Sequence, residues 1–173
     1  MTLYVYGDKY LPNKNLTDGV WCVGKMANDL GFKDGDIILE ADGEKIVRFS
    51  DVPEKILLSE VITIERDGAS SDVKMPTNVI DVFLKNNNQP LFYPRIPTII
   101  SSVVKNSNAE NAGLKKNDLI IGINETPIKY HDEFKEELKK YKGGEITLVI
   151  NRGGERVSLF AKVGSDGKLG FAP

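Results

Sequence analysis

The chain has 173 residues, of which 40% are hydrophobic and 28% charged, and its formal net charge is −2. This composition is typical of a globular protein and argues against a disordered chain. Acidic and basic residues are interspersed, which argues against nucleic acid or an anionic membrane surface as the main partner. The only cysteine, Cys22, excludes an internal disulfide and a thiolate metal cage.

The first half of the chain has the hydrophobic periods of short strands and helices. Residues 1–15 are expected to form an arm, because residues 7–15 are a polar stretch that contains Pro12. The elements predicted after the arm are strands at 20–23, 36–41, 61–65 and 72–75, and helices at 26–30 and 50–58.

Residues 77–85 form an amphipathic pattern, with Val79, Ile80, Phe83 and Leu84 on one side of a predicted helix. The polar run at 86–90 that follows is the best candidate for a linker. We therefore expect four segments: an N-terminal arm at 1–15, a first domain at 16–76, a linking helix and linker at 77–90, and a second domain at 91–173.

The second half repeats this plan. The predicted elements are strands at 96–104, 119–124, 145–151 and 156–163, and helices at 109–113 and 131–141. Residues 168–172 are predicted to form a last short strand, which is a candidate for an exposed edge.

Residues 31–46 align without gaps with residues 113–128, at an offset of 82 residues. Five positions are identical in the two copies: Gly31/Gly113, Lys33/Lys115, Asp36/Asp118, Ile38/Ile120 and Ile46/Ile128. Solenoid repeats have much shorter periods, so a repeat of this length indicates two copies of one domain. Each copy must bury a modest core of its own.

Residues 107–120 resemble the signature SPAxxAGLKxGDxI of the PDZ domain in its bacterial protease form. Asn108 stands where the signature has proline, and Asn117 where it has glycine. The first copy keeps residues 31–38 of the pattern but lacks the Ser-Pro-Ala entry. The resemblance implies a mainly β fold with short helices (α+β), built as two tandem, partly open sandwiches or barrels of the circularly permuted bacterial topology.

Two such domains, with Tyr6-Gly7-Asp8 before them and residues 169–173 after them, resemble the tandem PDZ segment of a site-2 protease of the RseP type. This resemblance implies a monomeric, periplasmic segment of an inner-membrane zinc metalloprotease that cuts membrane-bound substrates such as anti-sigma factors. No cofactor is expected in the segment itself. The zinc motif His-Glu-x-x-His needs two histidines, and His131 is the only one in the chain. The chain by itself is therefore expected to be non-catalytic.

A PDZ domain binds an extended peptide, or the C-terminus of a substrate, as an added strand between a strand edge and a helix. The resemblance places this groove in the second domain at Ile96, Pro97, Thr98, Ile99, Ile100 and Ser101, facing His131, Phe134, Lys135 and Leu138. In the first domain it places the groove at Gly19, Val20, Trp21, Val23, Val52, Lys55 and Ile56. Pro97 has no N–H, which weakens the expectation of a full carboxylate site.

Other interpretations stay open for these residues. Phe134, Leu138 and Trp21 can equally be ordinary core residues, and His131 can be a helix cap. For the whole chain, the alternatives are the PDZ segment of a periplasmic serine protease of the HtrA type and a purely structural pair of domains.

Overall fold

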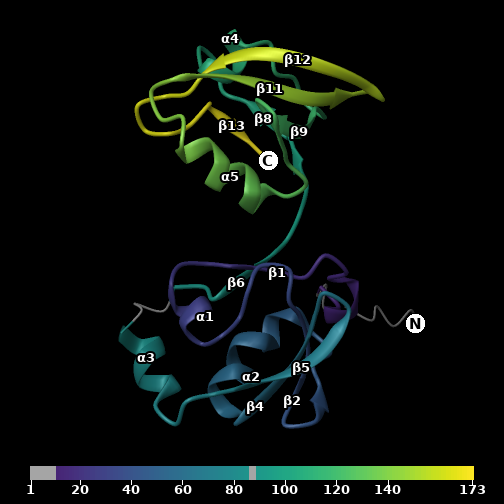
Figure 1. Cartoon of the computed structure of the whole chain (residues 1–173), viewed down its shortest axis with the longest axis vertical. Helices are drawn as coiled ribbons and strands as arrows, with labels where there is room; N and C mark the ends of the chain where they lie inside the picture. The colour runs from purple at the N-terminus through teal and green to yellow at the C-terminus, as the bar shows by residue number, and fades with distance from the viewer. Residues whose placement is uncertain (1–10, 86–88) are drawn as a thin grey trace, which may run out of the picture. The chain divides into compact units, whose positions relative to one another are not determined.

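A computed structural model describes residues 11–85 and 89–173. The chain divides into two compact units, residues 1–95 and residues 96–173, and each has its own hydrophobic core (Figure 1). The Tyr6-Gly7-Asp8 motif and most of the expected N-terminal arm lie outside the described residues. The expectation of a mainly β fold with short helices is confirmed.

The first unit is built on an antiparallel sheet with the strand order β3-β2-β4-β5, and a separate pair joins β1 to β6. Its elements in chain order are η1 (Asn13–Asn15), β1 (Val20–Cys22), α1 (Met26–Asp29), β2 (Ile37–Ala41), β3 (Glu44–Lys45), η2 (Phe49–Asp51), α2 (Val52–Leu58), β4 (Val61–Arg66), β5 (Ala69–Lys74), α3 (Val79–Lys85) and β6 (Phe92–Pro94).

The second unit repeats this topology. Its sheet has the order β10-β9-β11-β12, with β7 also paired to β9, and a separate pair joins β8 to β13. Its elements are β7 (Thr98–Ile99), β8 (Ser102–Val103), α4 (Asn108–Asn111), β9 (Leu119–Ile123), β10 (Thr126–Pro127), α5 (His131–Lys139), β11 (Glu145–Arg152), β12 (Glu155–Lys162) and β13 (Phe171–Ala172).

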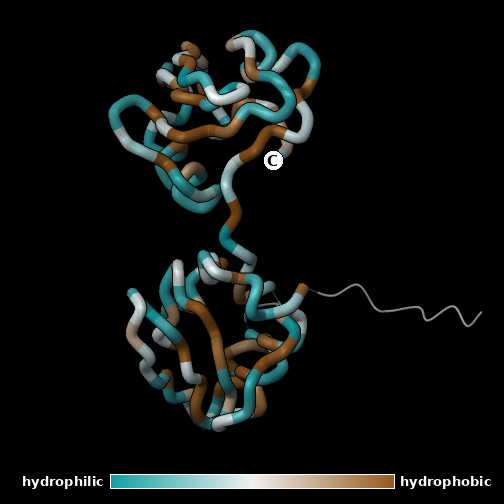
Figure 2. Tube along the Cα trace, turned by 90° about the vertical axis from the view of Figure 1, so that its right-hand side faces the viewer, coloured by the Kyte–Doolittle hydropathy of each residue, from teal (hydrophilic) through white to brown (hydrophobic). Residues whose placement is uncertain are grey.

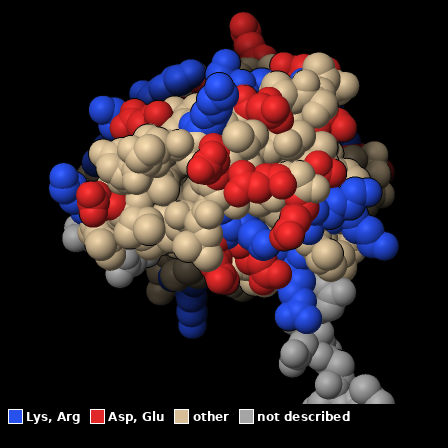
Figure 3. Space-filling model, turned by 90° about the horizontal axis from the view of Figure 1, so that it is seen from below, with Lys and Arg blue, Asp and Glu red and all other residues tan. Residues whose placement is uncertain are grey.

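Both cores lie between a sheet and the face of a short helix. Alternation along β4 buries Ile62 and Ile64 completely, and α2 covers them with the apolar face that contains Val52 and Ile56. The second core is arranged in the same way around Leu148 and its neighbours. In Figure 2 the hydrophobic stretches of the trace run through the interior of each unit, whereas the turns are mostly hydrophilic. On the face of the first unit in Figure 3, acidic and basic residues are interspersed.

A buried aspartate ties the helix end to the sheet in both units. In the second unit the Asp118 carboxylate is 1% exposed and accepts two hydrogen bonds of 2.7 Å from the Arg152 guanidinium. Arg152 also donates to the Gly113 carbonyl (2.8 Å), and the Lys115 amide donates to Asp118 (2.7 Å). Burial alone raises the pKa of Asp118, but Arg152 and the Lys115 amide outweigh it and hold the pKa below its usual value. The equivalent groups of the first unit are Asp36, Arg66, Gly31 and Lys33.

The division between the units falls after Arg95, five residues later than the expected start of the second domain at residue 91. Val20 of β1 pairs with Pro94 of β6, and the Arg95 amide donates to the Gly19 carbonyl (3.1 Å). These pairings attach residues 92–95 to the first unit. A polar run such as 86–90 indicates a break in regular structure but does not show which strand the next residues join.

Two other expected segments also belong to the first unit. The helix at 77–85 was expected to link the domains, but Val79 of α3 is buried in the first core, and Val82 and Phe83 pack against it. Residues 11–15 were expected to be part of an arm, yet the Asn13 side chain is buried and donates to the Ile38 carbonyl (2.5 Å). Both segments are therefore attached to the first unit by buried side chains, which are apolar in α3 and polar at Asn13.

Candidate functional site

Helix α5 is the element that positions most of the candidate site. The Glu133 carboxylate accepts hydrogen bonds from the amides of Lys129 (2.9 Å) and Tyr130 (3.2 Å), which satisfies donors at the helix start. Acidic residues in the first turn and a lysine in the last turn match the helix dipole. The spacing of Phe134 and Leu138, one turn apart, directs both side chains to the same face.

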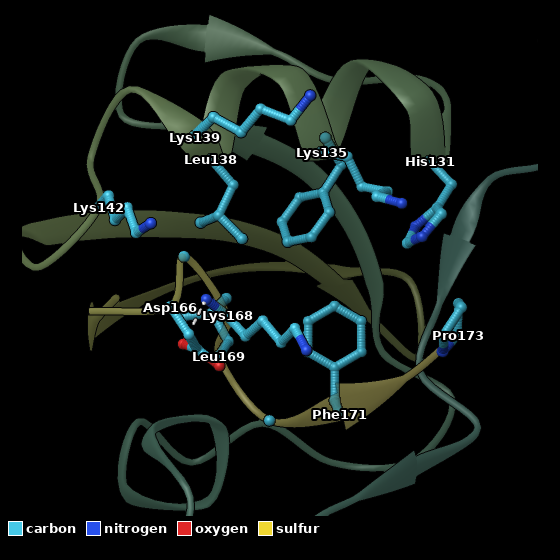
Figure 4. A pocket seen from close by; sticks show the side chains of 13 residues that line it. His131, Lys135, Leu138, Lys139, Lys142, Asp166, Lys168, Leu169, Phe171 and Pro173 are labelled. Atoms are coloured by element: carbon cyan, nitrogen blue, oxygen red, sulfur yellow. Dashed lines mark hydrogen bonds between the residues drawn. The ribbon is translucent and has the colours of Figure 1, made fainter. Parts of the chain in front are cut away.

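A groove of about 540 Å³ lies between α5 and the C-terminal segment at 166–173. Figure 4 shows side chains of α5 on one side of this groove and those of the C-terminal segment on the other. Phe134 and Leu138 are mostly buried in the second core but also line the groove. Across from them lie Leu169 and Phe171, and the rings of Phe134 and Phe171 are 5.6 Å apart. The groove therefore has an apolar floor.

The segment before β13 is held in place by the start of α4. The Gly170 carbonyl accepts hydrogen bonds from the Ser107 hydroxyl (3.0 Å) and the Val104 amide (2.9 Å). The Leu169 carbonyl accepts from the Ala109 amide (2.8 Å). Gly170 has a φ of +94°, and a Cβ added there would lie 2.4 Å from the Ser107 Cβ. Only glycine allows this backbone to approach α4 so closely.

Strand β13 has one edge occupied and one edge available. It pairs with β8 through Phe171↔Val103 and Ala172↔Ser102, and within the described residues it pairs with no other strand. The side of β13 turned away from β8 faces α5 across the groove (Figure 4). A strand edge beside a helix and an apolar groove is the geometry in which an extended peptide can add as a further strand.

The structure separates the residues expected to form this groove in the second domain. His131, Phe134, Lys135 and Leu138 line the groove, but the six residues expected to face them, Ile96, Pro97, Thr98, Ile99, Ile100 and Ser101, do not. Thr98 pairs with Ile120 and Ile99 with Leu119, so β9 occupies that edge. Thr98 and Ile100 are fully buried. The groove strand is β13 instead, in the segment predicted only as a candidate edge.

His131 is fixed at the start of α5. Its Nδ1 lies 3.2 Å from the Thr98 hydroxyl, and its ring stacks on Phe134 with the centroids 5.9 Å apart. Burial lowers the pKa of His131, Lys135 lowers it further, and Asp132 opposes them. Thr98 thus contacts the histidine of the groove although it does not line the groove itself.

In the first unit, β1 is hydrogen-bonded on both sides. Val20 pairs with Pro94 of β6, and its carbonyl accepts from the Gly35 amide (2.8 Å) on the opposite side. The Trp21 ring packs on Tyr93 with the centroids 5.7 Å apart. The other two residues expected on this edge also make close main-chain contacts, Gly19 with the Gly35 carbonyl and Val23 with Leu91. These residues form no open edge, contrary to the expectation.

The helix residues expected in the first groove are also accounted for by packing. Val52 and Ile56 are fully buried in the first core, and the Lys55 ammonium pairs with Glu44 (3.2 Å). Val52 and Ile56 are therefore ordinary core residues.

The last strand of the first unit is fixed by a buried aromatic side chain. Phe92 of β6 is 5% exposed and meets Phe32 edge-to-face, with the ring centroids 5.2 Å apart.

Sequence reasoning missed Leu169, Gly170 and Phe171 as groove residues. Two local signals pointed to them: the predicted short strand at 168–172 and the glycine that immediately precedes its aromatic residue. Neither signal shows which strand β13 joins, because β8 lies about 70 positions earlier in the chain.

Other kinds of site are not indicated. Across residues 11–85 and 89–173, no group of three or more His, Cys, Asp and Glu side chains is arranged to hold a metal ion. Among the helices that the structure describes, none is long and apolar enough to cross a membrane. Cys22 is buried, and burial followed by the charge of Asp34 raises its pKa to about 12, so it is a poor nucleophile.

The PDZ domain family model matches residues 81–151 of the chain. A probable periplasmic serine protease do/HhoA-like from Haemophilus influenzae is 30% identical over 153 residues, which is 79% of this chain and 33% of that protein. A putative zinc metalloprotease from Borreliella burgdorferi is 31% identical over 128 residues, which is 72% of this chain and 28% of that protein. The chain thus spans about a third or less of the length of these relatives.

Among solved structures, the chain is similar to the HtrA-type protease AlgW with decapeptide. That similarity has a TM-score of 0.36 at 17% identity and covers 66% of this chain and 42% of the other.

Proposed function

We propose that this chain, which contains a PDZ domain, recognises an extended peptide in the groove of its second unit and serves a larger protease without being catalytic itself. The observation that carries the proposal is the available edge of β13 beside the apolar groove along α5. Main-chain hydrogen bonds to β13 would hold the peptide, and Phe134, Leu138 and Phe171 would contact its side chains.

The segment before β13 is suited to a peptide C-terminus. The amides of Leu169 and Gly170 line the groove segment and donate to no acceptor within the described residues. Consecutive main-chain amides in a turn with a left-handed residue form a concave site for an anion. A terminal carboxylate would satisfy these donors, which removes the cost of leaving them unpaired as the peptide excludes water.

For the parent protein we propose a site-2 zinc metalloprotease of the RseP type, in which this segment governs the access of membrane-bound substrates from the periplasm. The metalloprotease relative supports this proposal, and zinc would then be held outside this chain, which has one histidine. The serine protease relative supports the alternative, a segment of an HtrA-type protease. The reading frame around the segment distinguishes them: hydrophobic spans and a His-Glu-x-x-His motif are expected only for the first.

In this proposal the first unit has a structural role. Val52 and Ile56 of its helix α2 are fully buried in the first core, whereas Phe134 and Leu138 of α5 also line a groove. We therefore expect one peptide to bind per chain. A stoichiometry of two in a calorimetric titration would contradict this assignment.

The peptide-binding proposal is tested by screening the whole chain against an array of decapeptides with free C-termini, then titrating the hits and their amidated forms. Phe171→Ala removes a groove side chain and is expected to weaken binding. Phe160→Ala is the matched control, because Phe160 lies on β12 outside the groove and is 84% exposed. Amidation is expected to weaken binding if the Leu169 and Gly170 amides hold the carboxylate. If no peptide binds, the segment does not capture termini, and a role as a size filter is what is left.

A further inference from the structure

Most of the charged residues that line the groove of the second unit are basic. Its lining includes His131 and one acid, Asp166, against four lysines, all exposed: Lys135, Lys139, Lys142 and Lys168. Figure 4 shows the lysines on both sides of the groove. The chain as a whole has a formal net charge of −2, so the positive charge here is local.

The acids near the groove compensate only part of this charge. The Asp166 carboxylate accepts a hydrogen bond from the Lys168 amide (3.1 Å), which holds it against its own loop. Glu136 pairs with the Lys139 ammonium at 2.5 Å. For Lys142 and Lys168 no acidic partner occurs among the described residues. The Lys142 side chain lies over the loop, 3.9 Å from where a Cβ of Gly167 would be.

The repeat shows that the packing of the helix does not need the basic residues of α5. At the offset of 82 residues, Phe49, Pro53 and Leu57 of the first unit stand in place of His131, Lys135 and Lys139. The packing residues between these positions are buried in both units. Val52 and its counterpart Phe134 are at most 2% exposed, and Ile56 and its counterpart Leu138 are at most 5% exposed. The helix therefore packs in the same way with or without the lysines.

We propose that the groove of the second unit selects peptides that carry acidic side chains upstream of the bound end. This inference rests on the proposed function, because it specifies the ligand of the same groove. The apolar floor made by Phe134, Leu138 and Phe171 holds the peptide. The lysines at the rim discriminate by charge, since complementary charges favour the right partner and like charges reject the wrong one.

The experiment uses the whole chain and three fluorescein-labelled decapeptides that share one apolar C-terminal tripeptide. They differ only upstream, where they carry four glutamates, four glutamines or four lysines. Because an exposed ion pair changes an affinity by roughly two- to fivefold, we expect the glutamate peptide to bind about tenfold more tightly than the glutamine peptide at 50 mM salt. The lysine peptide should bind most weakly, and the differences should shrink at 300 mM salt.

Charge reversal in the groove gives the matched comparison. Lys142→Glu with Lys168→Glu is expected to weaken the glutamate peptide about tenfold and to strengthen the lysine peptide. The control is Lys105→Glu with Lys116→Glu, which changes the net charge equally at exposed positions outside the groove and should change the affinities less than twofold. Far-UV circular dichroism verifies that both variants are folded.

The outcomes separate this inference from the proposed function. Equal binding of the glutamate and glutamine peptides, unchanged by the groove reversal, would overturn the charge selectivity and leave peptide binding intact. Failure of all three peptides, and of every array peptide, would refute the proposed function itself. If vesicles containing phosphatidylglycerol bind through Lys142 and Lys168 and displace no peptide, the lysines serve a lipid surface and the inference is wrong.

Discussion

Replacing Gly170 by alanine tests whether the loop before β13 must approach α4 as closely as the structure shows. The added Cβ would lie 2.4 Å from the Ser107 Cβ and 3.0 Å from its hydroxyl oxygen. Gly154 provides a matched control in the β11–β12 turn. Its φ is +95° against +94° at Gly170, and a Cβ there would meet nothing within 4 Å.

The two substitutions share one cost and differ in another. A left-handed φ costs an alanine roughly 1 to 2 kcal/mol at either position. At Gly170 the contact with Ser107 adds overpacking of about 1 to 3 kcal/mol, and a shifted loop loses the Ser107–Gly170 hydrogen bond, worth about 1 kcal/mol. We therefore expect Gly154→Ala to lower the free energy of unfolding by about 1 kcal/mol and Gly170→Ala by about 3 kcal/mol.

Urea unfolding followed by far-UV circular dichroism measures both values, and peptide titration measures the groove. Gly170→Ala should also weaken peptide binding, because Leu169 and Phe171 flank the displaced residue. Combining it with Ser107→Gly removes the opposing Cβ and should recover part of the loss. If Gly170→Ala costs no more than Gly154→Ala and binds peptides like the wild type, the close approach to α4 has no role in shaping the groove.

Three further predictions concern ionisable groups. Arg152→Met leaves the Asp118 carboxylate buried without its guanidinium partner and should destabilise the second unit by about 3 kcal/mol at pH 7. The first unit, whose unfolding is followed by the emission of Trp21, should unfold as in the wild type. The pKa of Asp118 is lowered in the folded state, so the stability that this carboxylate contributes is present above about pH 4 and is lost as the pH falls through the folded pKa. The destabilisation by Arg152→Met should therefore shrink in acid. A destabilisation that is independent of pH would refute the role of the carboxylate. Cys22, with its pKa raised to about 12, should react with a thiol reagent at pH 8 only as fast as the protein opens, and rapid stoichiometric labelling of the native protein would contradict its burial. In an NMR titration His131 should show a pKa below 6.5, rising when a glutamate peptide is bound, and a value of 6.5 or more in the free protein would contradict its burial.

The amino-acid sequence by itself determined the local elements and their repetition. The pattern of acids, apolar residues and lysines predicted a helix at 131–141, and the structure has α5 at His131–Lys139. Alternation and turn residues located β9 and the β11–β12 hairpin, and the repeated segment at 113–128 has the same succession of elements as 31–46. These features depend on neighbours in the chain, so they can be predicted from spacing.

The tertiary structure alone decided which strand edge is available. Residues 96–101 and 168–172 both have the composition of short strands, but β7 pairs with β9 and does not line the groove, whereas β13 pairs with β8 and lies along it. The attachment of residues 92–95 to β1 was decided in the same way. The partner of a strand depends on hydrogen bonds between segments far apart in the chain, and no local pattern specifies them. The helix side of the groove was therefore predictable from the sequence, and its strand side was not.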